Sequence, residues 1–525
     1  MLLFQAEVES FQAEVVEMCE AEEGDCGGGQ LWKPPRRSRP LKCMKCKEGS
    51  PVLIIRVGDA FCKTCFKDYY IHKFRATLGK NRCIYPGEKV LLAFSGGPAS
   101  SSMVWQVQEG LSQGAAKKLR FKPGIVYIDE GAVCGQSVAA REDICSEVER
   151  ILQTTGFPYH LVHLEEVFDL PSSVLHSVSH EISDQSHSYK EAVDDFIKQQ
   201  REKERDAGEL FLKNQQGELN LQDSSRRKEF ADPGKEVPAV SHTEELINLF
   251  QTVKTLTAKE ELLQTLRTHL ILHVARTNGY SKVMMGDSCT RVAVKLLTNL
   301  CLGRGAFLAA DTGFSDNRYG DVLFLRPMRE YPAKEIAFYN RLFGVPSVFI
   351  PALDTKASER ASIHRLIESF LYKLQSEFPS TVSTVYRTGE KLSGDTGGLS
   401  EPAQCLFCLC SLDTNVVDGS SLQSTLLSEQ LCKKKTSPSP GADGCCGGTG
   451  DQAGCCQSPR VTRDSSPHTQ ILAFLCYSCR LTAKDMNCLE SLPPYIQSEA
   501  EHRQCRAAMK REIQEFLLEE DPETS

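Results

Sequence analysis

The cysteines of this chain occur in matched pairs, and these pairs constrain the fold more than any other feature. Cys43 and Cys46 form one Cys-x2-Cys knuckle, and fifteen residues later Cys62 and Cys65 form another. Two knuckles supply the four sulfurs of a structural zinc site. The intervening segment VLIIRVGDAF predicts two strands joined by a Gly-Asp turn, which returns the second knuckle to the first. A redox site is the alternative, but redox chemistry needs only one pair.

A second matched set lies near the C-terminus. Cys405 and Cys408 form its first knuckle, and Cys476 and Cys479 form its second, after 67 intervening residues. Closing such a long loop costs only logarithmically more free energy than closing a short one. We therefore predict a second zinc site, for which Cys410 is a possible substitute ligand.

The N-terminal segment, the length of the apolar runs and the net charge indicate the cellular compartment in which these 23 cysteines occur. The first 17 residues carry four glutamates and no basic residue, so they do not form a secretory signal peptide. No apolar run reaches the roughly 18 residues that a membrane span needs. We predict a cytoplasmic protein, in which thiols stay reduced and bind metal rather than pair as disulfides. The net charge of −8 excludes a uniformly basic surface, so any RNA contact must be a local patch.

Alternating apolar strands and amphipathic helices over residues 86–355 predict an α/β domain with a parallel sheet. The expected strands lie at 89–94, 124–129, 159–164, 281–286 and 322–327. The expected helices lie at about 103–111, 139–153, 262–274, 291–302 and 334–342. A polar stretch at about 171–243 is predicted to be a flexible insertion.

The remaining segments are assigned by composition and period. We predict a disordered tail (1–40), a zinc ribbon with a basic helix (41–85), a helical connector (356–400), a C-terminal cysteine module (401–490) with a low-complexity insertion at about 411–470, and a C-terminal helix (491–525).

A serine and glycine loop, Ser95 to Ser102, follows the first strand of the α/β domain and precedes a helix. Glycines let backbone N–H groups approach an anion, hydroxyls add donors, and a helix N-terminus adds a favourable dipole. The predicted nucleotide-binding residues are Ser95, Gly96, Gly97, Ser100 and Ser101. An ordinary Ser/Gly turn is the alternative.

A basic strip follows the first cysteine module. Lys73, Arg75, Lys80 and Arg82 are interleaved with aromatic residues, the combination typical of RNA-binding surfaces. The alternative is a solvated helix whose aromatic side chains pack inward. His269 and His273 are four residues apart on one predicted helix, and we interpret them as core or surface histidines rather than metal ligands.

The loop sequence AFSGGPASS resembles the PP-loop, usually SGG-x-D-S, of ATP pyrophosphatases that adenylate a tRNA base. A zinc ribbon before this loop is the arrangement of the tRNA 2-thiolation family, and segments such as KCMKCKEG, GYSKVMMGDSCTR and LCYSCR are similar to that family. The resemblance spans Cys43 to Arg480 and implies the PP-loop (adenine nucleotide alpha hydrolase-like) fold. The resemblance is strongest to the non-catalytic or weakly catalytic member of the two cytoplasmic 2-thiolation proteins.

The chain departs from the catalytic members of this family at several positions. Ala99 replaces the loop aspartate, which argues against ATP/Mg²⁺ chemistry. The family motif GHN-x-DD is replaced by Gly286 to Arg291, and the two sulfur-handling cysteines are absent, one from TLTAKEE and one near Leu325. Cys134 and Cys289 are the remaining candidates for catalysis, and a buried, inert cysteine is the alternative for each.

The resemblance implies a subunit of the cytosolic complex that 2-thiolates wobble uridine (mcm5s2U34) in tRNA for Lys, Glu and Gln. The implied partners are tRNA, the catalytic cytoplasmic tRNA 2-thiolation protein 1, in a heterodimer, and a thiocarboxylated ubiquitin-related sulfur carrier. Two alternatives remain: the chain is itself an ATP-dependent tRNA sulfurtransferase, or it is a zinc-ribbon interaction protein unrelated to RNA.

Overall fold

The computed structural model describes residues 42–55, 59–112, 118–176, 189, 192–199, 238–392, 404–412 and 471–513. The predicted tail at 1–40 lies outside these residues, as do most of the predicted insertions at about 171–243 and 411–470. The helix α6 (Val240–Thr252) begins inside the range predicted as the first insertion.

A six-stranded sheet forms the centre of the molecule, in the order β5-β4-β3-β6-β8-β7. Five of its strands are parallel: β3 (Lys89–Ala93), β4 (Lys122–Asp129), β5 (Tyr159–His163), β6 (Lys282–Met284) and β8 (Leu323–Leu325). Four of them lie within predicted strand ranges and β4 begins two residues before its range, so the predicted parallel sheet is confirmed. The edge strand β7 (Ser315–Asp316) is antiparallel and was not predicted, because two residues show no period.

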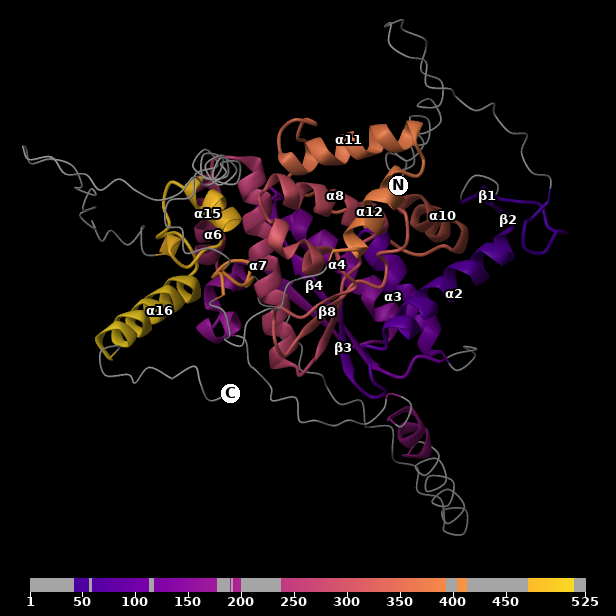
Figure 1. Ribbon diagram of the computed structural model, residues 1–525, viewed down its shortest axis with the longest axis horizontal. Coiled ribbons are helices and arrows are strands. Elements are labelled where there is room, and N and C mark those ends of the chain that lie inside the picture. Colours follow the sequence, from indigo (N-terminus) through magenta and orange to yellow (C-terminus); the bar gives the residue numbers. More distant parts are fainter. Residues whose placement is uncertain are drawn as a thin grey trace, which may run out of the picture.

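Both faces of this sheet are covered by helices (Figure 1). Val90 and Leu92 pack on one face with α3 (Pro98–Leu111), α4 (Val138–Thr155) and α10 (Ala333–Phe343). Leu91 packs on the other with α6 and α7 (Leu256–Thr277). This alternation explains the run of apolar residues in β3, since a strand covered on both sides has no solvent-facing position.

The remaining elements extend this core. A third cluster joins α8 (Cys289–Cys301), α11 (Ile363–Glu377) and α12 (Thr381–Glu390). The shorter elements are η1 (Leu164–Asp169), η2 (Ser172–Leu175), η3 (Gly305–Phe307), α9 (Leu308–Thr312) and α15 (Tyr477–Lys484), and the last helix is α16 (Pro494–Ile513). No helix among the described residues is both long and apolar enough to cross a bilayer.

The N-terminal module is a hairpin of β1 (Leu53–Ile54) and β2 (Ala60–Phe61), which pair antiparallel as predicted. The helix α2 (Lys63–Asn81) leads out of it. Tyr70 fixes α2 to the α/β domain: its hydroxyl lies 2.7 Å from Ser102 Oγ, and its ring stacks on Tyr339 at 3.9 Å between centroids. The module is therefore held against α3 and α10.

Candidate metal centres and the glycine loop

The N-terminal knuckles meet as predicted. The sulfurs of Cys43, Cys46, Cys62 and Cys65 all lie within 4.8 Å of one another. Cys46 Sγ and Cys62 Sγ are 3.9 Å apart, close to the separation of about 3.8 Å that a tetrahedral zinc with 2.3 Å bonds requires. Gly49 donates its N–H to Cys46 Sγ at 3.3 Å. A Cβ atom at Gly49 would lie 2.9 Å from Cys62 Cβ, so this close approach needs glycine.

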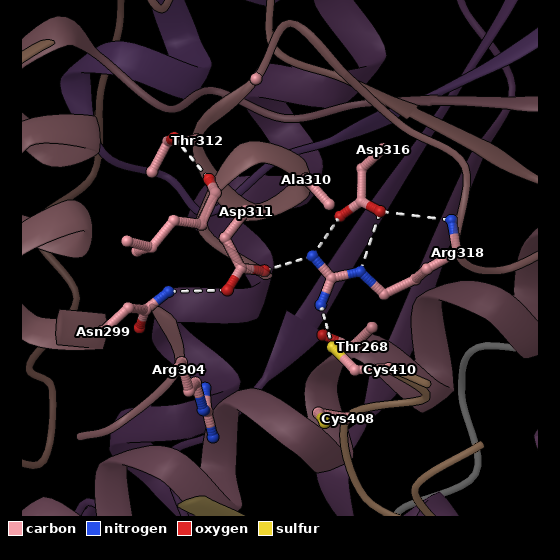
Figure 2. Close-up of polar contacts among 12 residues, drawn as sticks. Thr268, Asn299, Arg304, Ala310, Asp311, Thr312, Asp316, Arg318, Cys408 and Cys410 are labelled. Atoms are coloured by element: carbon pink, nitrogen blue, oxygen red, sulfur yellow. Dashed lines mark hydrogen bonds and ion pairs between the residues drawn. The ribbon is translucent and has the colours of Figure 1, made fainter. Parts of the chain in front are cut away.

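The C-terminal knuckles also meet, although most of the chain between them lies outside the described residues. The sulfurs of Cys405, Cys408, Cys476 and Cys479 lie within 4.8 Å of one another, and Cys408 Sγ is 3.6 Å from Cys476 Sγ. Both four-cysteine groups therefore fit a divalent metal that prefers thiolates. Cys410 is not one of the four; its sulfur instead accepts a hydrogen bond from Arg318 Nη1 at 2.8 Å (Figure 2).

The C-terminal centre sits on α7 through His269, which is fully buried. His269 Nε2 donates to the carbonyl of Phe407, inside the first knuckle, at 2.8 Å, and Nδ1 accepts from the Tyr495 hydroxyl at 2.6 Å. Burial lowers the pKa of His269 to about 4, so the ring is neutral near pH 7. The interpretation of His269 as a core histidine is confirmed.

The glycine loop connects β3 and α3 as predicted, but its own chain covers it. Gly96 has a φ of +75°, a conformation that favours glycine, and a Cβ there would lie 2.6 Å from Ile350 Cδ1. Val348 donates its N–H to the Gly96 carbonyl at 2.9 Å. The segment between these two residues therefore packs directly on the side of the loop where Gly96 lacks a side chain.

Two hydroxyls predicted to bind phosphate make hydrogen bonds within the loop instead. Ser100 Oγ donates to the Gly97 carbonyl at 3.0 Å and accepts from Ser95 N at 3.2 Å. Ser101 Oγ donates to the Gly96 carbonyl at 3.3 Å. Ser100 and Ser101 are buried, whereas Ser95 is exposed and Gly97 half-buried. The geometry thus supports a loop-stabilising role for Ser100 and Ser101 and leaves Ser95 and Gly97 as the accessible positions.

Neither candidate thiol has an activating environment. Cys289 is the first residue of α8, yet it is buried, and burial raises its pKa to about 11. Burial likewise raises the pKa of Cys134, beyond the end of β4, to about 12. The favourable dipole of a helix N-terminus therefore does not offset the loss of hydration at Cys289.

Charged groups fill the carboxyl ends of neighbouring strands. Arg267 on α7 reaches across to Glu130 after β4, with Nη2 2.8 Å from Oε2. Asp287, after β6, pairs with Arg326, after β8, at 3.4 Å. Leu325, at the position where the resemblance expects a cysteine, is fully buried. Ion pairs within the chain therefore occupy this edge of the sheet.

The basic strip is only partly available to a ligand. Lys73 Nζ lies 2.8 Å from Glu335 Oε2, and it lies 4.4 Å from the ring centroid of Tyr331. Lys73 is thus engaged within the protein, and no local pattern indicates its partner on α10, which lies 262 residues away in the chain. Lys80 and Arg82 are exposed and Arg75 is half-buried. Of the interleaved aromatic residues, Phe66, Tyr70 and Phe74 are buried, as the alternative interpretation expected.

A largely parallel α/β domain with two four-cysteine centres is the class of protein that this fold and these sites define. The family described as cytoplasmic tRNA 2-thiolation protein 2 matches residues 362–481. The chain is 54% identical over 517 residues to the protein of that name from Rattus norvegicus, covering 96% of each chain. The human protein is 55% identical over 501 residues (93% and 95% covered). This chain belongs to the family of cytoplasmic tRNA 2-thiolation protein 2.

A solved structure is also similar: the U34-tRNA thiolase NcsA from Methanococcus maripaludis with its 4Fe-4S cluster. It is 16% identical, with a TM-score of 0.41, over 69% of this chain and 93% of that one. A likeness of this size carries no inference about function or cofactor.

Proposed function

We propose that this chain is the non-catalytic or weakly catalytic subunit of the cytosolic complex that 2-thiolates U34, beside a 5-methoxycarbonylmethyl group, in tRNA for Lys, Glu and Gln. The family membership supports a role in tRNA 2-thiolation. The catalytic partner is 2-thiolation protein 1, in a heterodimer, and the sulfur comes from the thiocarboxylate of a ubiquitin-related carrier.

The surroundings of the two candidate thiols support the subunit assignment, since Cys289 is buried, Cys134 is half-buried, and desolvation raises the pKa of both. A thiol with a pKa of about 11 or 12 holds very little thiolate at pH 7, and the thiolate is the nucleophile. The loop supports the same conclusion, since Ala99 removes a magnesium ligand and Ile350 packs against Gly96. Sulfur activation therefore belongs to the partner.

Zinc in both four-cysteine centres is part of this proposal. The four sulfurs of each centre have the donor chemistry and spacing of a closed tetrathiolate site, in which the metal supplies structural cross-linking. The chain itself brings the knuckles together, through the hairpin at the N-terminal centre and through α7 at the C-terminal one.

The proposed tRNA contact lies on α2. Arg75, Lys80 and Arg82 are the members of the basic strip that remain accessible, and phosphate contacts from such side chains supply sequence-independent affinity. Because Tyr70 anchors α2 to α3 and α10, these cations keep a fixed position relative to the α/β domain.

Reconstitution tests the assignment directly. The chain alone and the chain with its catalytic partner are assayed for 2-thiolation of a wobble-uridine tRNA. We expect activity only in the pair, and near wild-type activity for Cys134→Ala, Cys289→Ala and the matched control Cys301→Ala. Activity of the lone chain, or a loss of several orders of magnitude for Cys289→Ala in an intact complex, would establish the sulfurtransferase alternative instead.

A further inference from the structure

At each knuckle of the C-terminal centre, one largely buried arginine from the α/β domain contacts the knuckle or the residues that flank it. Arg304, which follows α8, donates from Nε to Ser478 Oγ at 2.9 Å, and its Nη2 lies 3.9 Å from Cys479 Sγ. The same Nη2 lies 2.5 Å from Glu261 Oε2 on α7. Arg304 therefore connects the second knuckle to a carboxylate of the core.

Arg318 makes a comparable connection to the two residues that flank the first knuckle, Gln404 and Cys410. Its Nη1 donates to Cys410 Sγ at 2.8 Å, and its backbone carbonyl accepts from Gln404 Nε2 at 3.2 Å. The guanidinium is also paired with Asp311 and lies 2.8 Å from Asp316, so carboxylates hold its opposite edge (Figure 2). The two arginine side chains are only 13% and 11% exposed.

We propose that Arg304 and Arg318 are positioning residues that preorganise the two knuckles for one thiolate-preferring divalent metal, raising its affinity and slowing its release. This inference rests on the proposed metal binding at the C-terminal centre. It goes further by assigning the retention of the metal to two side chains outside the ligand set.

The reason for such residues is the separation of the knuckles in the chain. The 67 residues between Cys408 and Cys476 do not bring the two knuckles into register as a short hairpin does. An arginine has a planar, permanently charged fork, so it can hold a carboxylate at one edge and a sulfur at another. Arg304 holds the ligand sulfur of Cys479 directly, whereas Arg318 holds Cys410, which follows the first knuckle and lies outside the ligand set.

Metal titration of the full-length chain tests the proposal. The variants are Arg304→Gln, Arg318→Gln and their combination. Arg141→Gln is the matched control, because Arg141 is also buried between two carboxylates, Asp129 and Glu165, at 2.7 Å from each. Zinc affinity and release to a chelator are measured, and a Cys46→Ser background removes the signal of the N-terminal centre.

We expect Arg304→Gln and Arg318→Gln each to lower zinc affinity at the C-terminal centre by about 10- to 100-fold, the size usual for residues that hold metal ligands in place, and to accelerate release. The control should retain wild-type values. With Co²⁺ as the probe, the sulfur-to-metal charge-transfer band of Arg304→Gln should shift to lower energy, because the Cys479 sulfur loses a hydrogen-bond donor. A purely structural role would not move that band.

The outcomes separate the two proposals. If the Cys46→Ser chain binds no zinc, metal binding at the C-terminal centre is wrong. If it binds zinc and the Arg304 and Arg318 variants match Arg141→Gln in affinity and band position, only the proposed role of the two arginines is wrong. Should Arg304→Gln fail to fold, Ser478→Ala removes one contact of Arg304 and leaves its ion pair. We expect a several-fold loss of affinity for Ser478→Ala, and unchanged affinity there would overturn the role of Arg304.

Discussion

The two four-cysteine centres share a ligand motif but differ in their surroundings, and they lie at opposite ends of the molecule (Figure 1). The N-terminal centre is built by one short hairpin, and its Cys46 is exposed. The C-terminal centre joins distant segments, belongs to the core cluster of α7, and has three buried cysteines. The same motif therefore joins residues that are close in the chain at one end of the molecule and distant segments at the other.

Removing one cysteine from each centre should give the largest effect, a difference in the free energy of unfolding between the two variants. Cys476→Ser should cost on the order of 5 kcal/mol in unfolding free energy, because the knuckles connect α7, α15 and the sheet edge. Cys43→Ser should open the hairpin and leave the α/β domain largely stable. Zinc analysis and urea unfolding measure both. Equal destabilisation by the two variants would remove the distinction.

Lowering the pH should reduce the free energy of unfolding of the region around His269. Its pKa falls from 6.5 in the unfolded chain to about 4 in the folded protein, so only the unfolded state takes up the proton between these values. The stabilisation is complete above pH 6.5 and declines as the pH falls, by about 2 kcal/mol at pH 5. Urea unfolding from pH 5 to 7 should show this slope in wild type and a flatter one in His269→Gln. His72→Gln, at an exposed position of α2, is the matched control.

A chelator should empty the centres in a fixed order. The N-terminal metal should leave first, because Cys46 is exposed and the hairpin can open without disturbing the core. The C-terminal metal should leave in a slow phase that Cys46→Ser retains and Cys476→Ser abolishes. Release of both metals in a single phase would argue that burial does not control retention.

Reversing the accessible positive charges of the basic strip should have the smallest effect, a weaker binding of tRNA. This result would locate the tRNA contact at the N-terminal end of the molecule. Arg75→Glu, Lys80→Glu and Arg82→Glu should each weaken tRNA binding by the complex and reduce its salt dependence by roughly one unit of log slope per lost contact. Lys510→Glu, on α16 at the other end of the molecule, is the control and should bind normally. Binding that is unchanged at two salt concentrations would favour a merely solvated α2.

Local patterns in the sequence were sufficient for much of this architecture. The spacing of Cys43 to Cys65 and the segment between them predicted the hairpin and its sulfur cluster. Continuous apolar runs such as VLLA in β3 predicted parallel strands covered on both faces, and the serine and glycine loop was predicted between β3 and α3. These features depend on residues that are close in the chain, so a period or a spacing records them.

Tertiary structure alone decided which side chains meet at each site. Lys73 pairs with Glu335 from a distance of 262 residues in the chain, and Arg318 meets Cys410 from 92 residues away. Ile350 likewise packs on Gly96, which changes an open anion loop into a covered one. Such contacts leave no trace in local composition, because either partner alone is an ordinary surface or core residue. They form only when the sheet brings distant loops to one edge, and there burial and pairing determine whether a lysine, a serine or a cysteine remains available for chemistry.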